Sequence, residues 1–330
     1  MSDLGFYVVL LLAMFFNFTN GFHDAANAIA TSVSTRALKL RTALLMAAAG
    51  NLIGSFFGAA VAATVGKGII SLPEDMSSLW VVGAALGGAI VWNLITWYFG
   101  MPSSSSHALI GGMVGAALAA SAPVLWGGVV NKVLVPMIIS PLVGFVVGYG
   151  VMLAILWIFR KGNPSTLNRR FRIAQTCSAA GMAFGHGMQD AAKTMGIVVL
   201  ALIVSGRQTG SEIPLWVFFL TAIVLSVGTA TGGRRIMKTL GSKIIELDPP
   251  QGFAAEATAS SVLYVASLGF GAPVSTTHVI SSAIMGVGAT KRITAVRWGV
   301  AGNMVIAWVS TFPAAGLMAA AFYGISQLFT

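Results

Sequence analysis

The sequence predicts an all-α, polytopic membrane protein with two inverted-topology repeats of about five crossings each and broken or re-entrant half-helices at the midplane. Three observations predict this fold. The chain is strongly apolar, three groups of residues recur in the same order in its two halves, and the basic residues of corresponding loops alternate between the halves. Together they describe a duplicated unit whose two copies cross a lipid bilayer in opposite directions.

The composition places most of the chain in lipid. Of the 330 residues, 56% are hydrophobic and 8% are charged, and the mean hydropathy is +0.86, whereas soluble domains carry about a quarter charged residues. Several apolar stretches reach the roughly 20 residues that a spanning helix needs. The first lacks a basic segment and a cleavage site, so we expect mature structure there rather than a signal peptide. The stretches are Leu4–Phe18, Ala43–Val65, Leu79–Phe99, Val133–Phe159, Ile213–Ala230 and Val300–Tyr323.

Three motifs in the first half of the chain have counterparts in the second half. Their offsets are 166, 171 and 172 residues, so the halves differ by short insertions only, and a duplicated unit explains them. The first motif is Gly21–Asn27 with Gly187–Lys193, and the second is Pro102–His107 with Pro273–His278. In the third, Trp126, Gly127, Asn131, Pro141 and Gly144 match Trp298, Gly299, Asn303, Pro313 and Gly316.

The distribution of Lys and Arg among the loops predicts the orientation, because cytoplasmic loops carry an excess of these residues. With both termini outside, most of the basic residues fall in cytoplasmic loops, and the basic loops of one half correspond to poor loops of the other. We therefore expect a first repeat at 1–159, a basic cytoplasmic connector at 160–172 and a second repeat at 173–330. The cytoplasmic cations would be Arg36, Lys39, Arg41, Arg160, Lys161, Arg169, Arg170, Arg172, Arg234, Arg235, Lys238, Lys243, Lys291, Arg292 and Arg297.

The formal net charge of +10 does not indicate nucleic-acid binding. The cations are divided among short loops and no aromatic platform is interleaved with them, so membrane topology explains them better. The single cysteine, Cys177, excludes an internal disulfide and a site built from several thiolates. Inverted repeats are typical of secondary transporters, whose substrate site lies at the midplane between the halves.

Three carboxylates fall inside apolar segments: Asp24, Asp190 and Glu256. A charge within a membrane costs at least a few kcal/mol, so such residues are candidate functional groups. All four histidines, His23, His107, His186 and His278, lie in or beside the repeated motifs. We expect His107 and His278 to orient helices by donating hydrogen bonds.

Two hydroxyl clusters are the most informative feature of the sequence. Pro102 and Pro273 each precede a run of hydroxyls that opens a short apolar helix, at Ala108–Ala120 and Val279–Ala289. One such cluster would be explained as a helix N-cap. Two clusters at repeat-related positions also offer positive helix ends, free N–H groups and hydroxyls, as a tetrahedral oxyanion requires. The candidate ligands are Ser104, Ser105, Ser106, Ser275, Thr276 and Thr277, together with Gln189 and Lys193.

Acids beside an anion site indicate that a cation or a proton binds as well. Asp24 and Asn27 share a helix face, as do Asp190 and Lys193. We expect Asp24, Asn27, Asp190 and Glu256 to hold the coupling ion, with Na⁺ at Asp24 and Asn27 or H⁺ on the acid. The ammonium of Lys193 would fill the second, symmetric cation position, which favours H⁺; the structural alternative is a simple ion pair with Asp190.

The stretch Asn20–Thr31, the Ser-His and Ser-Thr-Thr-His motifs, and Gly252–Glu256 resemble the PiT family of inorganic phosphate transporters, in its compact bacterial form. The similarity covers nearly the whole chain. It implies an inverted-repeat fold, phosphate uptake coupled to Na⁺ or H⁺ across the bacterial cytoplasmic membrane, and a homodimer. It also implies that Asp24, Asn27 and Asp190 form the site with the hydroxyl clusters, without a cofactor.

Two departures from the family pattern bear on the substrate. The family has Asn where this chain has Gln189, and Gln where it has Ala192. Because relatives also carry sulfate, another tetrahedral oxyanion is the main alternative cargo. A passive anion channel is a second alternative, although bare acids repel anions. The duplication of the Ser-His motif argues against a third alternative, an intramembrane serine protease, since acyl transfer needs one nucleophile with one base. We therefore expect a transporter and not an enzyme.

Overall fold

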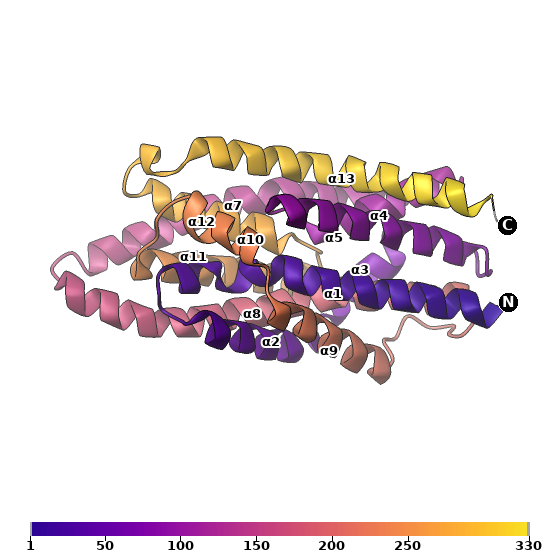
Figure 1. Ribbon diagram of the computed structural model, residues 1–330, viewed down its shortest axis with the longest axis horizontal. Coiled ribbons are helices and arrows are strands. Elements are labelled where there is room, and N and C mark those ends of the chain that lie inside the picture. Colours follow the sequence, from indigo (N-terminus) through magenta and orange to yellow (C-terminus); the bar gives the residue numbers. More distant parts are fainter. Residues whose placement is uncertain (1, 329–330) are drawn as a thin grey trace.

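The computed structural model describes residues 2–328, and this part of the chain is nearly all helical (Figure 1). Its only β-type contact is one isolated bridge between Ile70 and Val124. The first half contains α1 (Ser2–Ser34), α2 (Leu40–Ser55), α3 (Ala59–Lys67), α4 (Ser78–Phe99), α5 (Ser105–Ala119), α6 (Trp126–Val129), the π-helical turn η1 (Val130–Leu134) and α7 (Val135–Ile158). The second contains α8 (Pro164–Val204), α9 (Leu215–Thr231), α10 (Arg234–Lys238), η2 (Thr239–Lys243), α11 (Pro249–Tyr264), η3 (Val265–Gly269), α12 (Thr276–Ala289), η4 (Ile293–Ala295) and α13 (Trp298–Ser326).

The two halves follow the same order of elements. Each begins with a long helix, continues with a bent pair, a further helix and a short apolar helix, and ends with a long helix that contains a proline. The bent pairs are α2 with α3, at 70°, and α9 with the segment Arg235–Lys243, at 62°. The internal prolines, Pro141 in α7 and Pro313 in α13, match in the sequence repeat. This order supports the predicted duplication.

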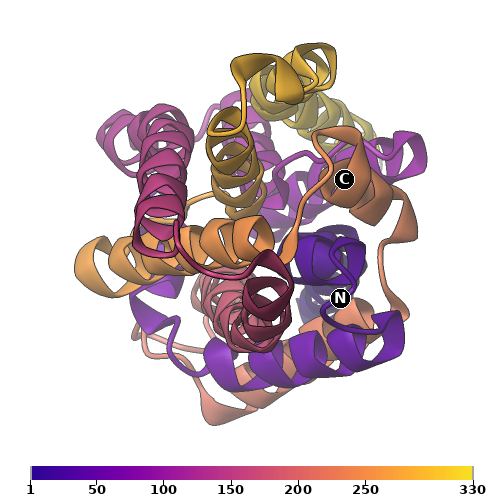
Figure 2. The same ribbon diagram turned by 90° about the vertical axis from the view of Figure 1, so that its left-hand side faces the viewer.

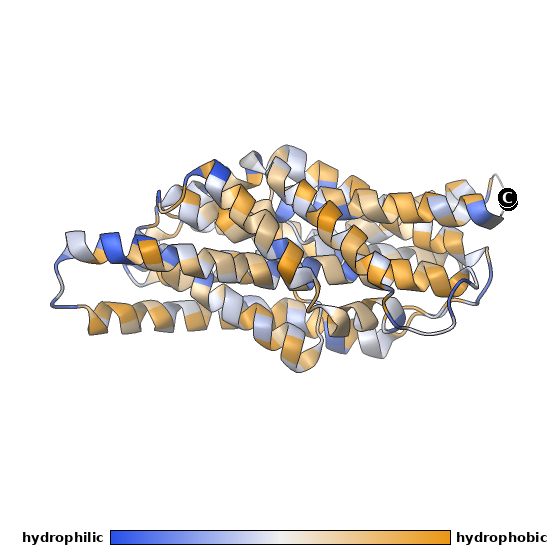
Figure 3. Cartoon of the chain, turned by 90° about the horizontal axis from the view of Figure 1, so that it is seen from below, coloured by the Kyte–Doolittle hydropathy of each residue, from blue (hydrophilic) through white to orange (hydrophobic). Residues whose placement is uncertain are grey.

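Five helices of the described residues are long and apolar enough to cross a membrane, or up to seven if each bent pair counts as one span. The predicted all-α membrane fold is thus confirmed. Both termini lie at one end of the molecule and the α7–α8 connector lies at the opposite end (Figure 1). Hydrophobic residues predominate along the helices, while hydrophilic residues are concentrated in the connections at the two ends (Figure 3). An odd number of crossings in each half accounts for this arrangement.

The long helices pack across the two halves in a reciprocal manner. A Cβ on Gly21 of α1 would lie 2.5 Å from the carbonyl oxygen of Leu225 in α9, and one on Gly187 of α8 would lie 2.4 Å from that of Asn51 in α2. Gly21 and Gly187 are equivalent in the repeat, so the same close approach is made twice. The two motif-bearing helices, α1 and α8, also contact each other near the middle of the bundle (Figure 2).

Candidate functional site

Two short helices begin inside the protein, and both start with the predicted hydroxyl clusters. With 15 and 14 residues, α5 and α12 are shorter than a membrane span. Ser104 is the N-cap of α5 and accepts a hydrogen bond from the backbone N–H of His107 at 3.2 Å. Ser275 is the N-cap of α12 and accepts one from His278, also at 3.2 Å. The capping role therefore accounts for these two hydroxyls, and the next residues of each helix remain for other contacts.

The motif of α1 lies against both helix starts. Ser105 Oγ donates a hydrogen bond to Asp24 Oδ2 at 2.7 Å, which joins α5 to α1. The Asn27 amide donates to Thr276 Oγ1 at 3.1 Å and to Thr277 Oγ1 at 2.9 Å, which joins α12 to α1. All five side chains are at most 2% exposed. The two positive helix ends thus meet at one acidic and amide-bearing turn.

The second acid of the repeat completes the centre of the site. Lys193 Nζ lies 2.5 Å from Asp190 Oδ1, and His186 Nε2 lies 3.0 Å from Asp190 Oδ2. One ligand atom from each of Asp24, His186 and Asp190 lies within 4.8 Å of the other two. His23 Nδ1 also lies 2.7 Å from Asp24 Oδ1. Because two buried carboxylates face one ammonium, the ionised cluster carries one uncompensated negative charge when His23 and His186 are both neutral. A proton or a monovalent cation would balance that charge.

Two further observations describe the surroundings of this charge cluster. His186 Nδ1 lies 3.0 Å from Asn51 Oδ1 on α2, so the imidazole bridges α8 and α2. Asn27 Oδ1 is buried and has no hydrogen-bond partner among the described residues. A buried acceptor usually has a partner, and an oxygen of this kind next to a carboxylate suits a hard cation.

Glu256 belongs to a separate polar cluster between α11, α8 and α1. Its Oε1 accepts hydrogen bonds from Thr31 Oγ1 at 2.5 Å and from the Gln175 amide at 3.2 Å. Its Oε2 accepts one from Ser178 Oγ at 2.5 Å. Thr31 stands seven residues beyond Asp24 on α1, or about 10 Å along the helix. Glu256 therefore does not join the Asp24 and Asp190 cluster.

Comparison with known proteins identifies the chain. The model of the phosphate transporter family matches residues 20–319. The chain belongs to this family. It is 47% identical to a probable low-affinity inorganic phosphate transporter of Rhizobium meliloti, over 97% of this chain and 96% of the relative. It is 44% identical to another of that description in Bacillus subtilis, over 98% and 97%.

A solved structure gives the same result for the fold. A structure described as the sodium-dependent phosphate transporter superposes with a TM-score of 0.90 at 26% sequence identity. The match covers 99% of this chain and 100% of that one. The family membership that the motifs imply is thus confirmed, and it agrees with a transporter rather than an enzyme.

Within this member of the phosphate transporter family, Gln189 has a different neighbourhood from the hydroxyl clusters. Its amide nitrogen donates to Ser267 Oγ at 2.7 Å and to the carbonyl of Ala272 at 3.1 Å. The repeat-equivalent His23 makes similar contacts, with Nε2 3.0 Å from Thr96 Oγ1. Gln189 thus connects α8 to the segment that precedes α12, and His23 connects α1 to the end of α4, which precedes α5. In the structure, Gln189 positions α12.

The structure corrects the expectation for His107 and His278. Both are buried, and their ring nitrogens have no hydrogen-bond partner among the described residues. The two rings pack together instead, with centroids 4.9 Å apart, and His278 stacks on Trp308 at 4.2 Å. The rings lie where α5 and α12 meet, so their role there is packing.

Sequence reasoning left several residues of these clusters unassigned. His186 contacts Asp190 four residues later, a spacing that places both on one helix face and that could have indicated the pair. Gln175 and Ser178 gave no such signal, because only the packing of α8 on α11 brings them to Glu256. The structure brings together Asp24, Asn27, Ser105, Thr276, Thr277, Asp190 and Lys193, with Ser106 Oγ 3.5 Å from the Val274 carbonyl.

Proposed function

We propose that this protein imports inorganic phosphate across the bacterial cytoplasmic membrane as a symporter, with both termini outside and the connector inside. The observation that carries the proposal is the meeting of two hydroxyl-bearing helix starts at Asp24 and Asn27. The N–H groups and dipoles of helix starts favour anions, and the hydroxyls add donors of suitable geometry for a tetrahedral oxyanion. The names of the relatives support phosphate as that anion.

The hydrogen bonds of Asp24 suggest how anion and cation binding are coupled. In the structure, Ser105 donates its hydroxyl hydrogen to Asp24 Oδ2, while Asp24 Oδ1 lies 2.7 Å from His23 Nδ1 and 3.4 Å from Thr277 Oγ1. A carboxylate only accepts hydrogen bonds, whereas a protonated one also donates. Protonation of Asp24, or binding of a cation to it, releases these hydroxyls to donate to phosphate. The oxyanion and the coupling ion therefore favour each other's binding.

Lys193 supports H⁺ as the coupling ion. Its ammonium is fully buried at Asp190, where the first repeat has the neutral Asn27. The ammonium permanently balances one of the two negative charges of the buried acids Asp24 and Asp190. One proton is then enough to balance the other negative charge. The superposed transporter is described as sodium-dependent, which makes Na⁺ the alternative. Glu256, with hydroxyl and amide groups around it, is a second candidate for carrying the coupling ion.

The substrate assignment is tested by uptake of radiolabelled phosphate into proteoliposomes that contain the purified protein. Unlabelled phosphate and arsenate, which share size and protonation, should compete, while sulfate should not. The variant Asp24→Asn, which keeps the shape of the side chain, serves as the inactive control. Uptake of sulfate that exceeds uptake of phosphate would replace phosphate with sulfate as the cargo.

A further inference from the structure

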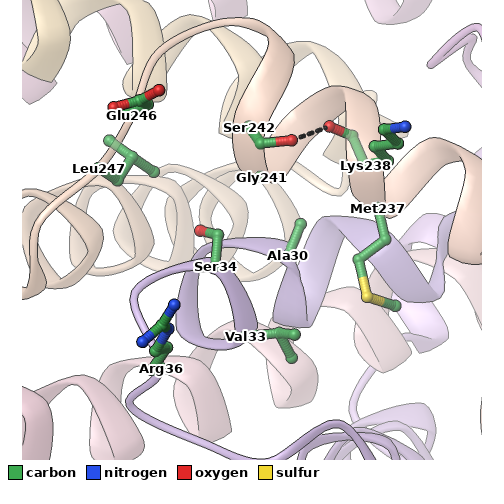
Figure 4. A pocket seen from close by; sticks show the side chains of 10 residues that line it. All are labelled: Ala30, Val33, Ser34, Arg36, Met237, Lys238, Gly241, Ser242, Glu246 and Leu247. Carbon is green, nitrogen blue, oxygen red and sulfur yellow. Dashed lines mark hydrogen bonds between the residues drawn. The ribbon is translucent and has the colours of Figure 1, made fainter.

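A cavity of about 600 Å³ lies beyond the buried site, at the end of α1 that points towards the connector (Figure 4). Its walls include Ala30 and Ser34 of α1, Arg36 after this helix, Lys238 and Ser242 of the α10–η2 segment, and Glu246. Neither Arg36 nor Lys238 has a carboxylate partner among the described residues, while Glu246 lies 3.8 Å from Arg297. The cavity therefore has two uncompensated cations and an acid that a third cation offsets.

The backbone of Arg36 has a conformation that is unusual for a residue with a side chain. Its φ is +58°, in the left-handed region that glycine adopts without cost. The backbone N–H groups of Arg36 and Ala37 donate to Val33 and Ser32, so Arg36 ends the helix where glycine is the usual residue. A non-glycine residue in this conformation is a known feature of functional sites.

The cavity is close to the buried polar groups and opens into a wider basic region. Ala30, the first cavity residue on α1, follows Asn27 by three residues, so the cavity begins about 5 Å along the helix from the Asn27 turn. A second cavity of about 600 Å³ shares Glu246 and is lined by Lys291, Arg292 and Arg297. Cations at the mouth of a pathway raise the local concentration of anions.

We propose that the cavity at Arg36 and Lys238 is a second, weaker oxyanion site, which holds phosphate on its way between the buried site and solution on the connector side. This inference rests on the proposed transport of phosphate. The chemistry recognised is a phosphate group, which free phosphate or the headgroup of an anionic lipid can supply. The lipid composition of the vesicles therefore separates these two sources.

The test measures phosphate exchange in proteoliposomes of a single orientation, which is verified by protease access to the connector. The concentration of phosphate that gives half-maximal exchange is determined on each face. In the double variant Arg36→Gly and Lys238→Gln, it should rise about three- to tenfold on the connector face, the scale of two exposed charge pairs. It should stay unchanged on the other face, and the effect should shrink as ionic strength rises.

Two controls separate an effect of the cavity from a general effect of surface charge and from misfolding. Lys161→Gln with Arg169→Gln removes the same charge from the same face but away from the cavity, and should leave both values unchanged. Arg36→Gly should melt at the same temperature as the parent protein or higher, since glycine suits the left-handed turn. An unchanged melting temperature of the double variant then separates a loss of affinity from misfolding.

Outcomes that overturn the inference are distinct from those that overturn phosphate transport. Equal half-saturation values for the double variant and the parent protein would remove the second site and leave transport intact. An equal shift with the control pair would show a general surface charge instead. An effect in phosphatidylglycerol vesicles that is lost in phosphatidylcholine vesicles would assign the cavity to lipid headgroups. Failure of the parent protein to exchange phosphate would overturn the proposed function itself.

Discussion

Removal of one hydroxyl from a half-helix start should weaken phosphate binding without disturbing the fold. Ser105 Oγ lies 2.7 Å from Asp24 Oδ2, and both residues are at most 1% exposed. A hydrogen bond to a charged group contributes about 1.5–3 kcal/mol, and about 1.4 kcal/mol is a tenfold change in affinity. Ser105→Ala should therefore raise the half-saturating phosphate concentration roughly 10- to 150-fold. Thr276→Ala tests the same reasoning at the second half-helix.

The assay is initial uptake of radiolabelled phosphate over a range of concentrations, with the amount of inserted protein measured in parallel. Ser282→Ala is the matched control, because among the described residues this buried hydroxyl donates only to the Val279 carbonyl of its own helix. It should leave the half-saturating concentration unchanged. Unaltered apparent affinity in both Ser105→Ala and Thr276→Ala would refute the reasoning, because the hydroxyls would then serve the helix ends alone.

Three further predictions follow from the acids, the lysine and the close helix contacts. Asp24→Asn and Asp190→Asn should abolish uphill accumulation, measured as the steady-state phosphate ratio, and unimpaired accumulation in both would remove their role in coupling. Lys193→Asn should create a requirement for a second cation, seen as stimulation of uptake by sodium; unchanged proton-driven uptake would leave the lysine structural. Gly187→Ala should lower the melting temperature, since its Cβ would meet Asn51 at 2.4 Å and overpacking costs about 1–3 kcal/mol. Gly150→Ala should leave the melting temperature unchanged, because a Cβ there meets nothing within 4 Å. Equal melting temperatures of the two variants would contradict the close packing of α8 on α2 at Gly187.

The sequence was sufficient for the fold because its signals are local. A run of apolar residues specifies a helix in lipid whatever its neighbours are, and the equivalence of Gly21 and Gly187 reflects the duplication directly. The half-helices were predictable for the same reason, since a proline followed by hydroxyls marks a helix start wherever it lies.

The contacts between helices were less predictable. The pairing of Glu256 with Ser178 and Gln175 depends on the rotation of α11 against α8, which composition does not specify. The neighbours of Gln189 depend on where the segment before α12 turns back. His107 and His278 were expected to donate hydrogen bonds, but the meeting of two equivalent helices brings their rings into mutual contact instead.

The most direct test of the account is phosphate uptake into sodium-free proteoliposomes under an inward-directed pH gradient. The buried ammonium of Lys193 and the hydroxyls held by Asp24 predict accumulation of phosphate against its gradient, lost when the pH gradient is collapsed by a protonophore. Accumulation that requires sodium and does not respond to the pH gradient would contradict proton coupling. Uptake that follows neither gradient and stops at equal concentrations would contradict the symporter itself.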